Sequence, residues 1–225
     1  MLCLLGLASS PGYVGWVLFL AKPGEAAIRE ALGRRQSMPF SYAHVGATRT
    51  TPPAGWRVHH MRAPLGTGRQ TLEAAAAFLF SWKLLAVEGL EVFPSTETVE
   101  QGTNVAILSR HFGIWSLDFC RVVYVLKNER EDDGAVLRTG FGYGTLPGHA
   151  VRGEEIFSIE WRVRTEEVWY DIYSFSLPAS PLVKLLSPVA RAAQRRFARQ
   201  SLEGAVRLAA DARIRPPFHP PGAAG

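Results

Sequence analysis

The segment SPVARAAQRRFARQSLEGAVRL, residues 187–208, decides the fold expected for this chain. Ser187 followed by Pro188 is a typical helix start, with serine as the N-cap and proline at the first helical position. At 100° per residue, the small and apolar side chains fall within about 60° of one line. These positions are Val189, Ala190, Ala193, Phe197, Ser201, Gly204 and Leu208. The segment therefore predicts a C-terminal helix about 30 Å long, enough to cross a whole sheet.

Basic side chains follow the opposite side of this predicted helix, at Lys184, Arg191, Arg195 and Arg199. Residues 181–210 hold six basic side chains against Glu203, so this segment has a net charge of +5, equal to that of the whole chain. One interpretation is a solvated helix face. Another is contact with an anionic membrane surface, at about 1 kcal/mol per basic residue. Nucleic acid is disfavoured as a partner, because no aromatic stacking platform or recognised module accompanies the charges.

Between residues 87 and 175 the helical period disappears and short β-branched and aromatic runs replace it. They include NVAIL, CRVVYVL, EEIFSIEW and EVWYDIYSF, separated by turn sequences such as EREDDG at 129–134. Strand alternation places Phe157, Ile159 and Trp161 on one face, and it places Tyr170 opposite Trp169. Both faces carry aromatic side chains. We therefore expect an antiparallel sheet that is covered on both sides.

Upstream, residues 25–35 and 69–85 show helical periodicity, residues 56–65 alternate as a strand, and residues 38–55 form an extended connector. The order strand, helix, antiparallel strands and long helix is that of a helix-grip, START-like domain. We therefore predict an α+β fold in which a curved antiparallel sheet wraps round the long C-terminal helix. Such a fold leaves a cavity between the sheet and the helix.

The composition of the 225 residues, 47% hydrophobic and 20% charged, is typical of a single globular domain. We assign it to residues 25–210. Residues 1–24 form an apolar segment, interpreted either as a targeting or anchoring sequence or as a buried start, and residues 211–225 are expected to be disordered. Two cysteines, Cys3 and Cys120, are too few for a disulfide framework. They favour a reducing compartment, which fits the cytoplasm or the surface of an organelle membrane.

Several stretches carry a family resemblance. They are FSYAHVGATR (40–49), GWRVHHMRAPLGTG (55–68), FGYGTLPGH (141–149), GEEIFSIEW (153–161), VWYDIYSFSLPAS (168–180) and RRFARQSL (195–202). Together they resemble the domain-of-unknown-function family nineteen-ninety, which has bacterial and plant members. The resemblance implies no assigned activity for the bacterial members. A plant relative described as a cation-selective channel of the chloroplast outer envelope implies a membrane or channel role as an alternative.

His149, Glu154 and Glu155 are the candidates for acid–base chemistry, because an imidazole beside carboxylates titrates in a useful range. The alternative is a hydrogen bond or salt bridge that stabilises a turn. No third ligand at a recognisable spacing predicts a zinc site, and we expect neither a metal nor a cofactor. The glycines of FGYGTLPGH lack the lysine and the following helix of a phosphate loop, so we interpret them as strand glycines that allow bending or close approach.

Two further histidine-containing stretches remain open. His111 and Asp118 flank the apolar loop HFGIWSLD, which fits either a gate for a bound molecule or membrane, or part of the core. His59 and His60 are adjacent on a predicted strand, so only one of them can face inward.

The function that the sequence favours is a non-catalytic binder of a small apolar molecule or lipid. We expect aromatic and aliphatic side chains of the sheet to line its cavity. They are Phe141, Tyr143, Phe157, Ile159, Trp161, Trp169, Tyr170 and Tyr173. Ranked behind it are a membrane-associated or channel protein, and an enzyme acting on the bound molecule.

Overall fold

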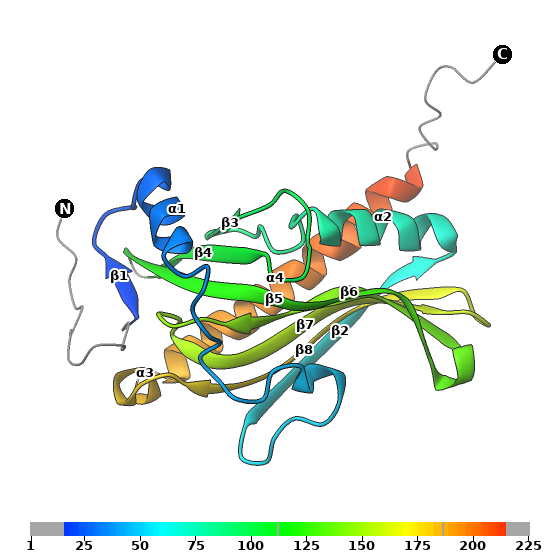
Figure 1. The fold of residues 1–225 in the computed structure, drawn as a ribbon. Helices are drawn as coiled ribbons and strands as arrows, with labels where there is room; N and C mark the ends of the chain where they lie inside the picture. The colour runs from blue at the N-terminus through cyan, green and yellow to red at the C-terminus, as the bar shows by residue number, and fades with distance from the viewer. Residues whose placement is uncertain (1–15, 112, 186, 215–225) are drawn as a thin grey trace.

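A computed structural model describes residues 16–111, 113–185 and 187–214. It is an α+β fold with one large curved antiparallel sheet, as predicted, and a long C-terminal helix (Figure 1). The strands are β1 (Val17–Phe19), β2 (Arg57–Thr67), β3 (Leu90–Pro94), β4 (Asn104–His111), β5 (Ile114–Glu131), β6 (Val136–Thr145), β7 (Val151–Arg162) and β8 (Glu167–Pro178). The helices are α1 (Glu25–Gly33), α2 (Arg69–Phe80), α3 (Pro181–Leu185) and α4 (Ser187–Ile214), with short 3₁₀ turns η1 (Ala47–Arg49) and η2 (Asp132–Gly134).

The sheet has the order β2-β8-β7-β6-β5-β4-β3, and β1 pairs with β5. Every pairing is antiparallel, and most strands pair with the next strand along the chain. The exceptions are β1, which pairs with β5, and β2, which crosses over to pair with β8. This crossover is possible because α2 carries the chain from one edge of the sheet to the other.

The two faces of the sheet are covered differently. The inner face packs against α2 and α4, whose apolar side chains join those of the sheet in one core. The outer face is covered by α1 and by residues 34–56, called the strap here, whose turn η1 contacts β7 and β8. Figure 1 shows α2 and η1 on opposite sides of the sheet. The prediction that both faces are covered is confirmed.

The N-terminal segment is described from Trp16 onward. Residues 17–19 form β1 and pair with Leu117, Ser116 and Trp115 of β5. The remainder of the predicted targeting or anchoring segment, residues 1–15, lies outside the described residues. Among the residues that the structure does describe, no helix is long and apolar enough to cross a membrane.

Helix α2 is shorter than predicted. It ends at Phe80, and the chain then turns through Trp82, whose backbone φ is +63°. Trp82 is nevertheless buried, with its ring 5.4 Å from that of Phe141, and Leu84 and Leu85 are buried beside it. Residues 81–85 are therefore not helical as predicted, because a tight turn packs Trp82, Leu84 and Leu85 into the core.

Helix α4 buries a different face from the one predicted. Ser201 is buried, and Phe197 and Leu208 are partly buried, as predicted, but the other residues of the buried line are Ala198, Leu202, Ala205 and Ala209. This line is rotated by roughly a quarter turn from the predicted one. Alanines at the centre of the face let α4 lie close to α2 and β2, and Ser201 Oγ donates to the Leu84 carbonyl oxygen at 2.6 Å. The side chains of Val189, Ala190, Arg191 and Ala193 lie outside the described residues.

Helix α4 extends beyond residue 210, where the domain was predicted to end. Helix α4 continues to Ile214, so residues 211–214 of the expected disordered tail are helical. Residues 215–225 lie outside the described residues.

The glycines of β6 make room for tyrosine rings on the outer face. A Cβ atom on Gly144 would lie 2.2 Å from Tyr42 Oη, and one on Gly142 would lie 2.5 Å from the Tyr124 ring. Both tyrosines are buried. The interpretation of these glycines as positions of close approach is therefore confirmed.

We predict that Gly144→Ala lowers the free energy of unfolding by about 1–3 kcal/mol, because the added methyl group must displace the buried Tyr42 ring. Gly33→Ala is the matched control, since no atom lies within 4 Å of its Cβ position. Urea unfolding of the three proteins measures the difference. Equal stability of Gly144→Ala and the wild type would show that Tyr42 does not need this space.

Candidate functional site

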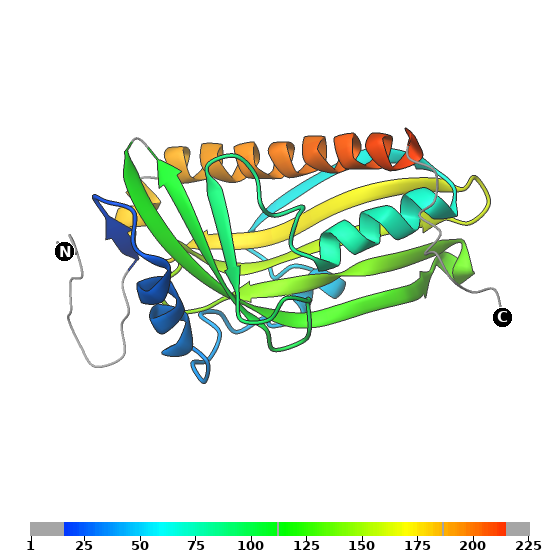
Figure 2. The same cartoon turned by 90° about the horizontal axis from the view of Figure 1, so that it is seen from above.

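A cavity of about 420 Å³ lies between the inner face of the sheet and the helices α3 and α4. Its wall is mainly apolar, with Leu90, Ile107, Tyr143, Val151, Val183 and Phe197 among the side chains that line it. The cavity exists because α2 covers only part of the inner face. Figure 2 shows α2 beside one half of the sheet, while α4 runs along its length. Beyond α2, the space between the sheet and α4 is left unfilled.

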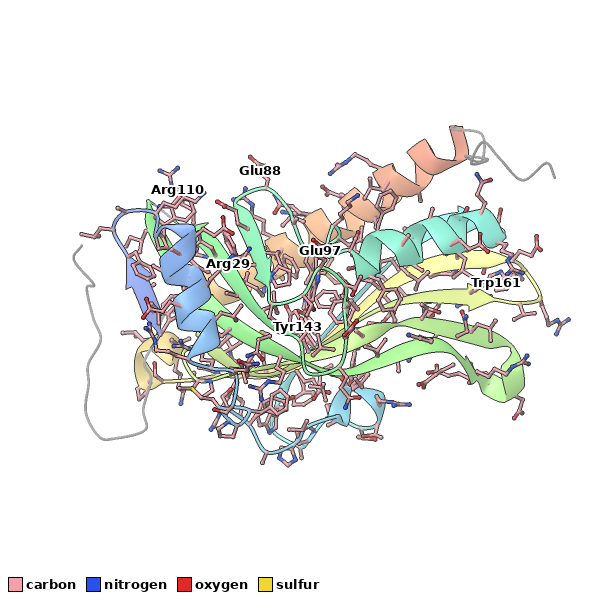
Figure 3. The ribbon with its side chains drawn as sticks, turned by 45° about the horizontal axis from the view of Figure 1, so that its top comes forward. Arg29, Glu88, Glu97, Arg110, Tyr143 and Trp161 are labelled. Atoms are coloured by element: carbon pink, nitrogen blue, oxygen red, sulfur yellow. The ribbon has the colours of Figure 1, made fainter. Side chains whose placement is uncertain are left out.

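Most of the side chains predicted to line a ligand site lie elsewhere. Tyr143 lines the cavity. Four others, Phe141, Phe157, Ile159 and Tyr170, lie on the inner face but are fully buried in the core with α2 and α4. Trp161 packs partly buried against the same core, and Figure 3 shows it at the end of the sheet remote from Tyr143. Core packing by α2, which the strand pattern does not reveal, removes these residues from the cavity wall.

Trp169 and Tyr173 lie on the outer face of the sheet. Alternation along β8 places them opposite Tyr170 and Ile172. The Trp169 ring is covered by the guanidinium groups of Arg62 and Arg162, at 4.7 and 5.5 Å from its centroid. Tyr173 lies edge-on to His60, with the two ring centroids 5.5 Å apart.

Glu155 is the carboxyl group on the cavity side of β7. It pairs across the sheet with Tyr143, whose hydroxyl donates a hydrogen bond to Glu155 Oε2 at 3.1 Å. Burial raises the pKa of the Glu155 carboxyl from 4.5 to about 7, and the hydrogen bond from Tyr143 opposes the rise. Near neutral pH this group is therefore divided between its protonated and ionised forms. It is able both to donate and to accept a proton inside the cavity.

Glu154, the adjacent residue, points to the outer face and is 2% exposed. Its carboxylate accepts hydrogen bonds from Tyr42 Oη at 2.5 Å, Gly46 N at 2.6 Å and Thr48 N at 3.0 Å, and also from the Thr48 hydroxyl. Four donors from the strap satisfy this carboxylate. Glu154 therefore anchors the strap to the sheet, as the stabilising alternative predicted, and its carboxylate is committed to that role.

His149 lies in the cavity wall, but its partner is Asp118 rather than Glu154. His149 Nδ1 accepts a hydrogen bond from Val151 N at 3.1 Å and lies 3.5 Å from Asp118 Oδ1. Asp118 Oδ1 in turn accepts from Ala150 N at 2.8 Å. Burial lowers the pKa of the imidazole, and its neutral form carries the proton on Nε2 because Nδ1 is an acceptor. The structure thus places His149, Asp118 and Glu155 in the wall of one cavity.

Further polar groups in the wall were not identified from the sequence. Ser116 Oγ and Trp16 Nε1 are buried in the wall without a hydrogen-bond partner among the described residues. His59, His111 and Ser109 also line the cavity. For His59 and His60, the sequence predicted that one of the two would face inward. It is His59 that faces the cavity. Serines within strands give no signal in sequence, because their burial depends on which elements cover them.

The described part of the chain contains no group of three or more His, Cys, Asp or Glu side chains that could hold a metal ion. Lys184, Arg195 and Arg199 are exposed, whereas the Arg191 side chain lies outside the described residues. Contact of these basic residues with an anionic membrane stays a prediction.

We predict that Glu155→Gln stabilises the protein over the wild type by more at pH 8 than at pH 5. The folded-state pKa of Glu155 lies above its unfolded value, so the wild type loses stability as the pH rises from about 4.5 through 7. The variant lacks this loss, and its advantage over the wild type should grow by about 1–3 kcal/mol between pH 5 and pH 8. Urea unfolding at the two pH values measures this difference.

The control for this experiment is Glu88→Gln, which removes the same charge from an exposed side chain. It should shift stability equally at both pH values. If Glu155→Gln behaved like the control, Glu155 would have an ordinary pKa in the folded protein.

Comparison with known proteins gives the family. Residues 41–204 match the family described as "Domain of unknown function (DUF1990)". A UPF0548 protein of Deinococcus radiodurans is 36% identical over 204 residues, covering 86% of this chain and 99% of that protein. A UPF0548 protein of Arabidopsis thaliana is 37% identical over 153 residues, covering 68% of this chain and 73% of that protein.

Among solved structures, a hypothetical protein of Helicobacter pylori is similar with a TM-score of 0.51 and 12% sequence identity, covering 77% of this chain and 99% of that one. At this identity the similarity shows the fold alone. The family match spans β2 to β8, the cavity wall except Trp16, and residues 187–204 of α4. The family resemblance seen in the sequence is confirmed, and the chain belongs to the DUF1990 family of uncharacterised UPF0548 proteins.

Proposed function

We propose that this protein binds a small, mainly apolar molecule in the cavity between the inner face of the sheet and α4. The observation that carries the proposal is a mainly apolar cavity of about 420 Å³ with a few polar groups in its wall. Ligand pockets typically have this size and composition. We include in the proposal that the fold is a helix-grip, START-like domain, because the order of its strands and helices is the one expected for that class.

The unpaired polar groups support a ligand with at least one polar atom. A buried hydroxyl or N–H group without a partner costs about 1–3 kcal/mol. Ser116 Oγ and Trp16 Nε1 both lie in the cavity wall in this condition. Both polar atoms are closed off in the structure, so a bound molecule that offers an oxygen atom would remove that cost only after the side chain turns toward the cavity.

An enzyme that transfers protons on the bound molecule is the second candidate. It is favoured by Glu155, whose pKa of about 7 suits a general acid or base and whose carboxyl lies in the same cavity wall as the neutral imidazole of His149. Deuterium incorporation into the bound molecule in D₂O, lost in Glu155→Gln, would favour this candidate over simple binding.

Filling the cavity tests the proposed function. Ser116→Phe places a ring in the cavity wall, and we expect it to weaken binding of the neutral dye N-phenyl-1-naphthylamine at least tenfold, about 1.4 kcal/mol. Fluorescence titration gives the affinity. Native mass spectrometry of the purified proteins should show a bound molecule in the wild type and less of it in the variant.

Two other variants make the experiment interpretable. Ser81→Phe adds the same ring at an exposed position outside the cavity and should bind the dye as the wild type does. Val183→Phe fills the cavity from the side of α3 and serves if Ser116→Phe does not fold. Unchanged dye affinity in a folded cavity-filling variant would contradict the proposal.

A further inference from the structure

Two arginines in the cavity wall have no counter-ion. Arg57 of β2 and Arg195 of α4 both line the cavity, and neither forms an ion pair or hydrogen bond with any residue that the structure describes. Two arginines of the outer face, by contrast, are neutralised by an acidic side chain. Arg62 and Arg138 both pair with Glu160, at 2.7 and 2.6 Å, on the outer face. Arg57 and Arg195 therefore differ from Arg62 and Arg138 in having no acidic partner among the described residues.

Arg57 and Arg195 lie on elements that pack together. Helix α4 contacts β2 along the cavity. His59, two residues from Arg57 on the same strand, also lines the cavity, and its pKa is lowered by burial and then by the positive charge of Arg195. Residues 57, 59 and 195 thus form one wall of the cavity, called the cationic wall here. The rotated face of α4 brings Arg195 to this position, which the predicted orientation of the helix would have turned away from the sheet.

The acidic groups of the cavity do not neutralise this wall. Asp118 Oδ1 already accepts the Ala150 N–H group and lies beside His149. Glu155 is hydrogen bonded to Tyr143, and no arginine is among the groups that influence its pKa. Glu154 points to the outer face, where the strap surrounds it. The positive charges of Arg57 and Arg195 are therefore available to a ligand.

Several of the remaining groups in the wall can donate a hydrogen bond. Trp16 Nε1–H can only donate, Ser116 Oγ–H is without a partner, and the neutral His149 ring carries its proton on Nε2. Cations and donors together are complementary to an anionic group that accepts hydrogen bonds. They are poorly matched to a ligand with an amine or another cationic group.

We propose that the molecule held in the cavity is an apolar monocarboxylic acid, whose carboxylate is bound by Arg57 and Arg195 while its hydrocarbon part lies against Ile107, Val183 and Phe197. This inference rests on the proposed function and names the chemical class of the ligand. A guanidinium group binds a carboxylate through two parallel N–H···O hydrogen bonds. Arg57 and Arg195 are both exposed residues that line the cavity.

The test compares two probes that differ in one group, decanoic acid and decan-1-ol. Isothermal titration of the full chain at pH 7.5 should give tighter binding of the acid. Arg57→Gln and Arg195→Gln should each weaken binding of decanoic acid at least tenfold and leave the affinity for decan-1-ol within twofold of the wild type. The alcohol keeps the hydrocarbon part and lacks the charge, so it reports on the apolar wall alone.

Arg199→Gln is the matched control. Arg199 is exposed on the same helix, one turn from Arg195, and does not line the cavity. It should leave both affinities unchanged. If Arg199→Gln weakened acid binding as much as Arg195→Gln, the effect would come from the general positive charge of α4, and the inference would be overturned.

The remaining outcomes separate this inference from the proposed function. Equal binding of acid and alcohol by the wild type, with no effect of either cavity arginine, would overturn the carboxylate while leaving an apolar-ligand site in place. Failure of both probes and of the neutral dye to bind would instead overturn the proposed function itself.

Discussion

The alternation of side chains along β7 is the constraint on which the organisation of this protein depends. Successive residues of a strand point to opposite faces, so Glu154 and Glu155 are sent to different environments although they are neighbours in the chain. The outward carboxylate gathers four donors from the strap and fixes it to the sheet. The inward carboxyl meets Tyr143 at the edge of a cavity, where burial raises its pKa. Strand β7 therefore holds the strap on the outer face through Glu154 and places the titratable carboxyl group of Glu155 on the inner face.

The cavity forms because different helices cover the two halves of the inner face. Helix α2 packs into one half of the sheet, and aromatic side chains there are removed from water and from any ligand. Among the described residues, α3, α4 and Trp16 border the cavity over the other half. Alanines along α4 allow close contact with α2 and β2, so the helix lies tightly where α2 is present and leaves space where α2 is absent. A bulky residue in place of Ala198 or Ala205 would lift the helix from the sheet.

The unpaired polar groups of the cavity wall lower the free energy of unfolding. A domain is stable by only about 5–15 kcal/mol, and a buried unpaired donor such as Ser116 Oγ or Trp16 Nε1 reduces that margin. On the outer face, by contrast, Glu154, Glu160 and Asp171 all have partners. Five other buried polar atoms without a partner among the described residues lie outside the cavity, in Trp82, Arg138, Ser158, Trp161 and Trp169. The unpaired donors of the cavity wall are therefore not peculiar to it.

Local pattern in the sequence determined the order of elements, the antiparallel sheet, the two faces of β7 and β8, and the family, because periodicity and short motifs depend on residues close together in the chain. The buried face of α4 was misplaced, since a line of alanines can be the closest contact only when α2 and β2 are already beside it. The eight aromatic and aliphatic side chains expected around a ligand were divided among core, cavity and outer face for the same reason. The placement of Arg57 and Arg195 in one cavity wall, and the contact of Asp118 with His149, join segments far apart in the chain. Only tertiary packing decides such meetings, because the energy that places each side chain comes from neighbours that the local sequence does not contain.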